Sequence, residues 1–171
     1  MLILNCGLKK EDTRCISSGS INLNKHKETA VSFREDSFLV SFGTAAQFNK
    51  DEYLRWLSSQ IKCFPDGFML LFHNGQPIGQ LEASVKSYGN QKIGYVHLYY
   101  ITEQQRERGC GTKLHQYANQ FFRTNGVSEY HLRVSPDNKT ALSFYKKQNL
   151  EVIGSELDGK VLRMRGAVLP E

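Results

Sequence analysis

The sequence lacks several features that mark membrane-bound, secreted or metal-binding proteins. No apolar run approaches the roughly 20 residues that a membrane-spanning helix needs. Residues 1–5 are apolar, but they are too short for a signal peptide and no basic stretch precedes them. The four cysteines lie far apart, without a Cys-x-x-Cys spacing or partnering histidines. We therefore expect a cytoplasmic protein with reduced thiols, no metal site and no membrane partner.

Charge of one sign is also not concentrated at any point of the chain. The net charge is +5, yet no run of five or more like charges occurs. A basic surface can attract nucleic acid, but the aromatic sheet motif with interleaved basic residues that is typical of RNA-binding modules is missing. The same surface also suits an anionic cofactor such as a nucleotide. We expect no nucleic-acid partner, and a basic binding module remains the less favoured alternative.

Hydrophobic periodicity predicts one α/β domain over residues 1–171, without internal repeats or linkers. Periodicity is weak over residues 1–30, and residues 17–22 are predicted to form a loop. Apolar and polar residues alternate over 31–42, which predicts a hairpin. Asn49, with Glu52 three positions later, then predicts the start of a helix that ends before Pro65.

A β-meander and a crossover unit are predicted to follow. Asn74-Gly75 is a strong signal for a tight hairpin turn. The apolar stripe from Leu114 to Phe122 predicts a helix that Gly126 caps. A right-handed crossover would place the strand after this helix parallel to the strand that ends at Ile101. Strands are predicted over 68–73, 77–86, 92–101, 130–134, 151–154 and 160–165, and a further helix over 136–147.

The segment Arg106-Glu107-Arg108-Gly109-Cys110-Gly111-Thr112 lies where the first of these helices begins. The first N–H groups of a helix lack intrahelical partners and lie at the positive end of its dipole. Two glycines leave these groups accessible, and the arginines add positive charge, so a pyrophosphate would bind well here. The third glycine of the dinucleotide motif and the Gly-Lys-Ser/Thr of a P-loop are both missing. Alone, the segment predicts an anion site or a tight turn without a ligand.

Two motifs together resemble the GCN5-related N-acetyltransferase (GNAT) family. Arg106-x-x-Gly109-x-Gly111 matches the family's Arg/Gln-x-x-Gly-x-Gly/Ala signature, although the common proline before it is Glu103 here. Downstream, Asn138-x-x-Ala-x-x-Phe-Tyr145 resembles the family's second hallmark helix. The usual Gly-Phe after that helix is Asn149-Leu150, and asparagine is the best non-glycine residue for a left-handed cap. The resemblance covers residues 68–165.

This resemblance implies a mixed, mostly antiparallel sheet of six to seven strands, flanked by helices and splayed at a central parallel strand pair. It also implies acetyl-coenzyme A (acetyl-CoA) as the co-substrate and a primary amine of a small molecule or protein as the acceptor. The resemblance assigns the thioester and the pantetheine arm to the backbone of Tyr100 and Ile101. Asn138 would bind the arm as well. The pyrophosphate would bind Arg106, Glu107, Arg108, Gly109, Cys110, Gly111 and Thr112.

Tyr145 is the candidate general acid, because a phenol can protonate the leaving thiolate; its alternative is a plain core aromatic. The general base stays open between Glu82, His97 and water. Cys110 is not expected to act as a nucleophile. Alternation along residues 92–101 places Tyr95 and Tyr99 on one face of the sheet and Tyr100 on the other.

The acceptor is not identified by any motif. In the family it is bound by the first helices and the loop between strands, here roughly residues 20–67, where Trp56 is predicted to pack against the sheet. A homodimer is possible, since dimers are common in the family. The alternative within the same fold is a non-catalytic sensor that binds an acyl-CoA.

Overall fold

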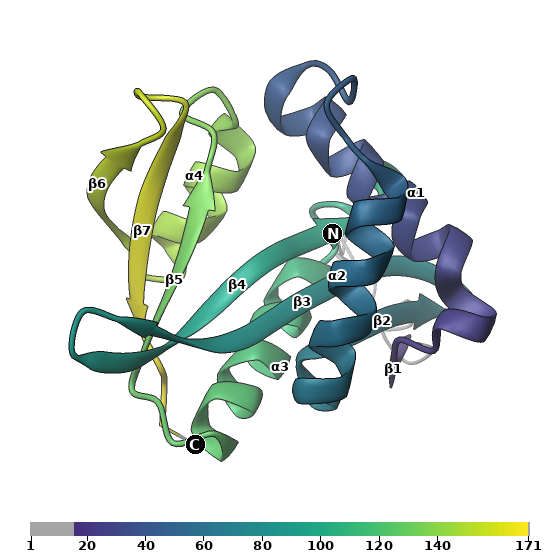
Figure 1. The fold of residues 1–171 in the computed structure, drawn as a ribbon, viewed down its shortest axis with the longest axis horizontal. Coiled ribbons are helices and arrows are strands. Elements are labelled where there is room, and N and C mark those ends of the chain that lie inside the picture. Colours follow the sequence, from purple (N-terminus) through teal and green to yellow (C-terminus); the bar gives the residue numbers. More distant parts are fainter. Residues whose placement is uncertain (1–15, 171) are drawn as a thin grey trace, which may run out of the picture.

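A single mixed sheet organises the computed structural model, which describes residues 16–170 (Figure 1). The strand order is β1-β2-β3-β4-β5-β7-β6, and every neighbouring pair is antiparallel except β4 and β5. The predicted mixed, mostly antiparallel sheet with a central parallel pair is confirmed. The strands are β1 (Ile16–Ser20), β2 (Phe68–His73), β3 (Gln76–Tyr88), β4 (Gln91–Ile101), β5 (Glu129–Val134), β6 (Glu151–Glu156) and β7 (Val161–Ala167).

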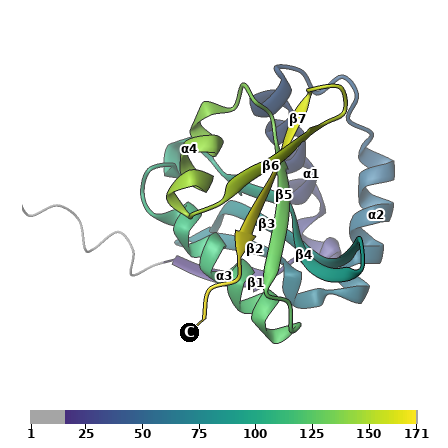
Figure 2. The same ribbon diagram turned by 90° about the vertical axis from the view of Figure 1, so that its left-hand side faces the viewer.

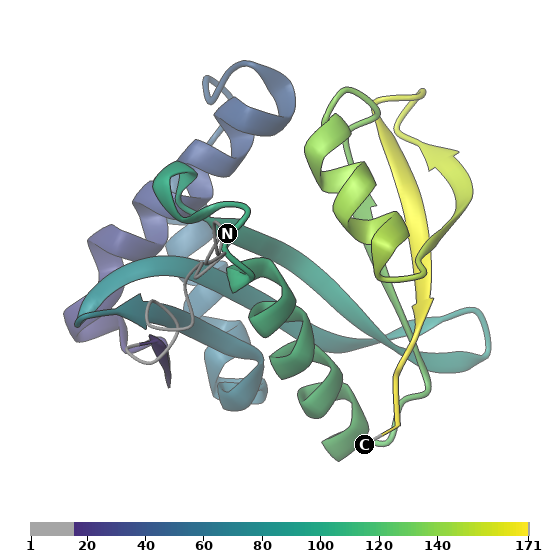
Figure 3. The ribbon, with the colours of Figure 1, turned by 180° about the vertical axis from the view of Figure 1, so that it is seen from behind.

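Helices cover both faces of the sheet (Figure 2). Two of them pack on one face over β2–β4, and the other two pack on the opposite face, as the view from behind shows (Figure 3). No helix within residues 16–170 has the length and apolar character that crossing a membrane would require. The four α-helices are α1 (Leu23–Phe42), α2 (Lys50–Cys63), α3 (Cys110–Thr124) and α4 (Lys139–Lys147), and two short 3-10 turns are η1 (Pro65–Gly67) and η2 (Glu103–Gln105).

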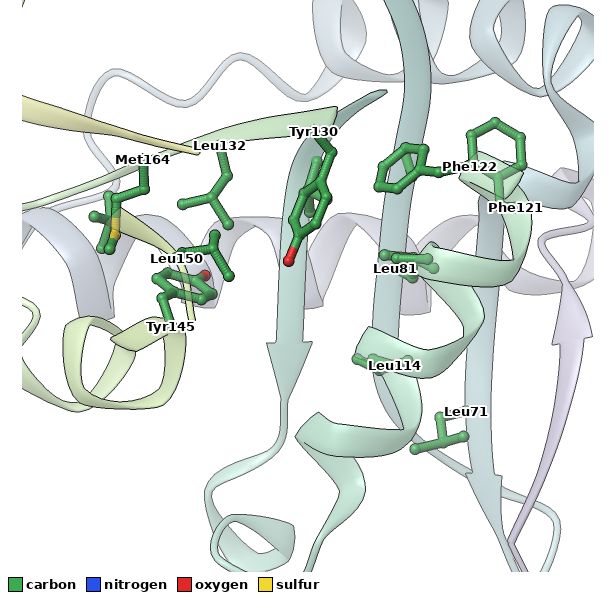
Figure 4. Packing of buried hydrophobic residues seen from close by; sticks show 14 of the residues in the cluster. Leu71, Leu81, Leu114, Phe121, Phe122, Tyr130, Leu132, Tyr145, Leu150 and Met164 are labelled. Carbon is green, nitrogen blue, oxygen red and sulfur yellow. The ribbon is translucent and has the colours of Figure 1, made fainter. Parts of the chain in front are cut away.

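Each face of the sheet has its own hydrophobic core. The larger core joins α3 and α4 to the sheet, and Figure 4 shows Leu114 and Phe122 of α3 beside Leu81 of β3. The smaller core joins α1 and α2 to β2 and β4 through residues such as Leu57 and Phe68, both of which are fully buried. This division follows from the alternation of side chains along strands that are covered on both faces.

A bulge in β4 interrupts that alternation next to the parallel pair. Glu82 pairs with Leu98, whereas the next residue of β3, Ala83, pairs with Val96, so His97 is the extra residue. The parallel pairing of β4 with β5 covers only Gly94–Val96, and beyond it the two strands diverge. Figure 3 shows β4 and β5 diverging in a V, with α3 beside β4 and α4 beside β5.

The bulge also corrects our prediction for the tyrosines of β4. Tyr99 packs against His115 of α3 and Tyr145 of α4, whereas Tyr100 packs against Phe33 of α1. Tyr95 lies on the face of Tyr100, because its ring contacts His97 on the α1 and α2 side. Tyr95 and Tyr99 were predicted to share a face; this is wrong, since the extra residue reverses the alternation between them.

Two predictions for the first part of the chain are also wrong. Residues 31–42 belong to α1 and do not form a hairpin. Asn22 caps this helix by accepting from the Asn24 N–H, and Gly43, in the left-handed conformation (φ 72°), ends it. Residues 17–20, predicted as loop, belong to β1 and pair with β2. The remaining predicted strands and helices are present, with bounds shifted by a few residues at most. The larger difference is in α3, which begins at Cys110, before Leu114, the first residue of the apolar stripe that predicted this helix.

Candidate functional site

The opening between β4 and β5 contains a cavity of about 1130 Å³. Its lining comes from both faces of the sheet: from α3, α4 and the turn before α3 on one face, and from α1 on the other. The cavity therefore passes through the sheet where β4 and β5 separate.

The glycine-rich turn forms one wall, and its two glycines are needed for different reasons. Gly109 precedes α3 with φ 79°, a left-handed conformation that other L-residues adopt only with strain. Gly111 has an ordinary backbone, but a Cβ there would lie 3.2 Å from the ring of Phe144 on α4. The first i→i−4 hydrogen bond of the helix is Lys113 N–H to Gly109 C=O, at 3.2 Å. The N–H groups of Gly111 and Thr112 thus have no partner within the helix, which suits a pyrophosphate.

Most of the residues predicted to bind the cofactor line this cavity. Arg108 and Cys110 are the exceptions. Cys110 is 1% exposed and packs in the larger core, so only its backbone can contact a ligand. The residues that do line the cavity are Tyr100, Ile101, Arg106, Glu107, Gly109, Gly111, Thr112 and Asn138.

The two backbone positions at the end of β4 point in opposite directions. Gln80 pairs with Tyr100, and the N–H of Thr102 donates to the C=O of Ile78, so alternate residues of β4 bond to β3. The N–H of Tyr100 is therefore directed toward β3, and that of Ile101 toward the opening. The C=O of Ile101 faces the same way, since it accepts from Nε of Arg106 at 3.1 Å. Of the two positions, Ile101 has the geometry for a backbone donor within the cavity.

Asn138 has a structural role that occupies half of its side chain. Its Oδ1 accepts from the N–H of Ala141 at 3.1 Å and so caps α4. The Nδ2 group remains as the donor for a ligand. The cap at the other end of α4 also matches expectation, because Asn149 has φ 61°.

Tyr145 projects from α4 into the larger core and also lines the cavity (Figure 4). Its ring centroid lies 6.1 Å from that of Tyr99, and 91% of its surface is buried. Burial raises the pKa of Tyr145 above the ordinary range of a phenol, so the hydroxyl keeps its proton at neutral pH. Tyr145 is thus a core aromatic that also borders the cavity, and its role as a proton donor stays a prediction.

Glu82 is not placed to act directly as a base. It is fully buried, does not line the cavity, and its carboxylate is held by three neighbours. Oε1 accepts from the Tyr53 hydroxyl at 2.5 Å and from Gln80 Nε2 at 2.7 Å, while Oε2 accepts from Arg34 at 3.2 Å. These contacts join β3 to α1 and α2, which is a structural function.

His97 lies at the bulge and lines the cavity, but it is a weak base there. Burial, and then the charges of Lys86 and Arg34, lower its pKa to about 3. Its Nε2 lies 2.8 Å from the Ser84 hydroxyl, and Trp56 packs edge-on against the ring. His97 is therefore neutral at physiological pH and binds a proton poorly.

The α1 side of the cavity is lined by charged residues that no sequence motif marks. Arg34 comes from α1, Lys86 from β3 and Arg133 from β5, so they are far apart in the sequence. The sequence hint is a weak one: Lys86 and Arg133 are charged residues inside predicted strands. No group of three or more His, Cys, Asp or Glu side chains that could hold a metal occurs in residues 16–170.

A sheet opened at a parallel strand pair, with a glycine-rich turn at a helix start beside it, is the arrangement that the GNAT resemblance implies. The model of the acetyltransferase (GNAT) family matches residues 29–150, and the chain belongs to this family. An uncharacterized N-acetyltransferase of Methanocaldococcus jannaschii is 29% identical over 102 residues. That match covers 58% of this chain and 44% of the relative, so the chain spans less than half of the relative's length.

Solved structures of the same fold include two from Thermoplasma species. Ard1 of Thermoplasma volcanium has a TM-score of 0.73 and 18% identity, over 91% of this chain and 99% of that chain. The PaiA N-acetyltransferase of Thermoplasma acidophilum, solved in complex with coenzyme A, has a TM-score of 0.69 and 19% identity, over 89% and 98%. At these identities the likeness concerns the fold.

Proposed function

We propose that this chain transfers the acetyl group of acetyl-CoA directly to a primary amine. One observation carries the proposal: the glycine-rich turn, the inward-facing N–H of Ile101 and the Tyr145 side chain all border the same cavity. Membership of the GNAT family and the coenzyme A bound to the PaiA enzyme support it. Acetyl-CoA would supply an activated acetyl group on a thiol that can leave.

Each wall of the cavity would have a separate task. The N–H groups of Gly111 and Thr112, at the positive end of the α3 dipole, would bind the pyrophosphate. Asn138 would hold the arm through Nδ2. The Ile101 N–H would donate to the thioester oxygen and stabilise the negative charge that develops on it as the amine attacks. Tyr145 would then give its proton to the departing sulfur, and the proton that the attacking nitrogen loses as the amide forms would return to the Tyr145 oxygen through water.

We infer that no side chain acts as a strong general base. Glu82 is buried and held by three partners, and the pKa of His97 is too low for the task. The cations beside His97 disfavour a protonated amine, so the acceptor would release its proton to water before it attacks. Cys110 is buried in the core, which supports direct transfer without an acyl-enzyme.

Thiol release from acetyl-CoA, measured across a panel of amines, tests the proposal. We expect saturable, amine-dependent release with at least one acceptor, and an acetylated product in the mass spectrum. Binding of acetyl-CoA without turnover on any acceptor would instead support a sensor of the same fold. Salt-sensitive binding to oligonucleotides, with no stabilisation by acetyl-CoA, would support a nucleic-acid-binding module.

A further inference from the structure

The α1 side of the cavity is lined by positive charge. Arg34, Lys86 and Arg133 all border it. Among the described residues that line the cavity, the single carboxylate is Glu107, which belongs to the glycine-rich turn on the other side. A ligand that enters from the α1 side therefore meets cations without a matching carboxylate on the wall.

The neighbouring carboxylates neutralise this charge only in part. Arg34 pairs with the buried Glu82 at 3.2 Å and also donates to the C=O of His97 at 2.9 Å. Arg133 donates to Glu156 at 2.6 Å, but the same carboxylate also binds Arg163. One negative charge is thus shared by two guanidinium groups.

Lys86 has no carboxylate partner within residues 16–170. Its ammonium lies 4.2 Å from the centre of the Tyr95 ring, a cation–π contact that leaves its hydrogen-bond donors available. Burial, followed by the charges of Arg133 and Arg163, lowers the pKa of Lys86, as expected where positive charges accumulate. Lys86 and Arg34 both act on His97, so their field reaches the point where β4 and β5 separate.

Exposed apolar side chains also line the cavity on the α1 side. Val40 and Phe42 at the end of α1, and Leu157 in the turn between β6 and β7, line the cavity and are 46%, 49% and 59% exposed. Phe38 lies beside Phe42, with ring centroids 5.8 Å apart. These apolar side chains suit the organic part of a small ligand, and the three cations suit an anion.

We infer that the acceptor is a small amine that also carries an anionic group, a carboxylate or a phosphate, and that Lys86, Arg34 and Arg133 bind this group. The inference rests on the proposed acetyl transfer and specifies its substrate class. A charge-assisted contact to Lys86 fixes the anionic end of the acceptor. A polyamine, in contrast, would bring positive charge against the same three cations.

Acceptor pairs that differ only in the anionic group test this inference. The pairs are free amino acids with their amides, and phosphoethanolamine with ethanolamine, each assayed by thiol release with the full chain. We expect kcat/KM to favour the anionic member by about tenfold or more, which is the order of one charge-assisted hydrogen bond. Amidation lowers the pKa of the adjacent amine, so the amide supplies more of the neutral nucleophile. A preference for the free amino acid could therefore not be explained by the reactivity of its amine.

Variants of Lys86 show whether this side chain carries the preference. In Lys86→Met the ratio of kcat/KM between anionic and neutral members should fall about tenfold, and Lys86→Arg should keep most of it. The ratio is taken within each variant, so a general loss of activity cancels. Lys92→Met, at an exposed position of the same β3–β4 hairpin outside the cavity, is the matched control and should keep the ratio of the unaltered chain.

Calorimetric titration of the coenzyme A complex with the same pairs gives a readout that does not need turnover. Tighter binding of the anionic member, lost in Lys86→Met, is the expected result. Equal or better use and binding of the neutral members would overturn the inference and leave acetyl transfer intact. Absence of turnover with every acceptor would contradict the proposed function, and the titration would still decide whether the α1 side selects anions.

Discussion

The two ends of the cavity are built in different ways. On the α3 and α4 side, the groups that we propose to bind the cofactor are mostly backbone N–H groups from one short segment, residues 101–112, arranged by a turn and a helix start. On the α1 side they are charged side chains from three separate elements, and a buried ion pair holds one of them in place. The first end depends on local backbone conformation, whereas the second depends on the correct packing of distant elements. Substitutions should therefore affect the two ends in different ways.

The largest effect should come from the ion pair beneath the α1 side. Glu82→Leu leaves Arg34, Tyr53 and Gln80 without their common acceptor. We expect the free energy of unfolding to fall by about 3 kcal/mol, because one partner of a buried pair is removed. Urea unfolding measures this change, with Glu35→Leu on the exposed surface of α1 as the control. A stable but inactive Glu82→Leu enzyme would instead indicate a catalytic base.

Tyr145→Phe should affect chemistry and leave both ends of the cavity intact. It removes the proposed proton donor and keeps the ring that packs in the core. We expect kcat to fall about 100-fold, within the usual contribution of general acid catalysis, with an unchanged KM for acetyl-CoA. Tyr130→Phe is the matched control, since Tyr130 is buried in the same core but does not line the cavity. Equal losses in both variants would mean that Tyr145 contributes only to packing.

A fall in pH should lower the free energy of unfolding through His97, which lies on the α1 side of the cavity. In the unfolded chain this imidazole binds a proton as the pH falls through about 6.5, whereas in the folded chain it does so only near 3. The unfolded state is therefore favoured on acidification, by roughly 2 kcal/mol between pH 7 and pH 5. This contribution is fully present above pH 6.5 and is lost as the pH falls.

Urea unfolding at the two pH values, repeated with His97→Gln, isolates this contribution. The substitution should remove roughly 2 kcal/mol of the pH dependence, while that of His115, whose pKa burial also lowers, stays. An unchanged pH dependence in His97→Gln would show that the folded protein accepts a proton at His97 readily, and would reopen the case for His97 as a base.

The smallest effect should be confined to the cofactor end. Gly109→Val places a β-branched side chain at φ 79°, which should distort the turn and weaken the binding of acetyl-CoA by about tenfold, or ~1.4 kcal/mol. Gly126→Val, at φ 68° after the other end of α3, applies similar strain away from the cavity. The control should lose stability but keep its affinity in a calorimetric titration. Equal affinities in the two variants would contradict a role for the turn in binding.

These two ends also explain what the sequence could and could not predict. The glycine-rich turn and the cap at Asn138 depend on neighbours within a few positions, and local motifs mark both segments. The motif at Asn138 predicted a contact with the cofactor, however, and not a helix cap. The cluster of Arg34, Lys86 and Arg133 forms only when β3, β4 and β5 pack beside α1, and no local sequence pattern predicts that packing. The bulge at His97 is equally hidden, although it reverses the faces on which the tyrosines of β4 lie.

The errors in secondary structure have a related cause. Residues 31–42 alternate in polarity, yet α1 is an uninterrupted helix that buries Ala30, Val31 and Phe33 against the sheet. Packing of a few side chains outweighed the local alternation. Residues 16–20 have little strand character of their own, and they form β1 because the edge of β2 offers hydrogen-bond partners.

The central claim is that one cavity, open on both faces of the sheet, receives the cofactor at one end and the acceptor at the other. Backbone amide NMR during titration with acetyl-CoA tests it most directly. We predict the largest shifts at Ile101, Gly111 and Thr112, and small shifts on α1; a later addition of a carboxylate-bearing amine to the coenzyme A complex should then shift residues around Lys86 and His97. Shifts from acetyl-CoA that are spread over the outer surface and spare Ile101 and the turn before α3 would contradict the account.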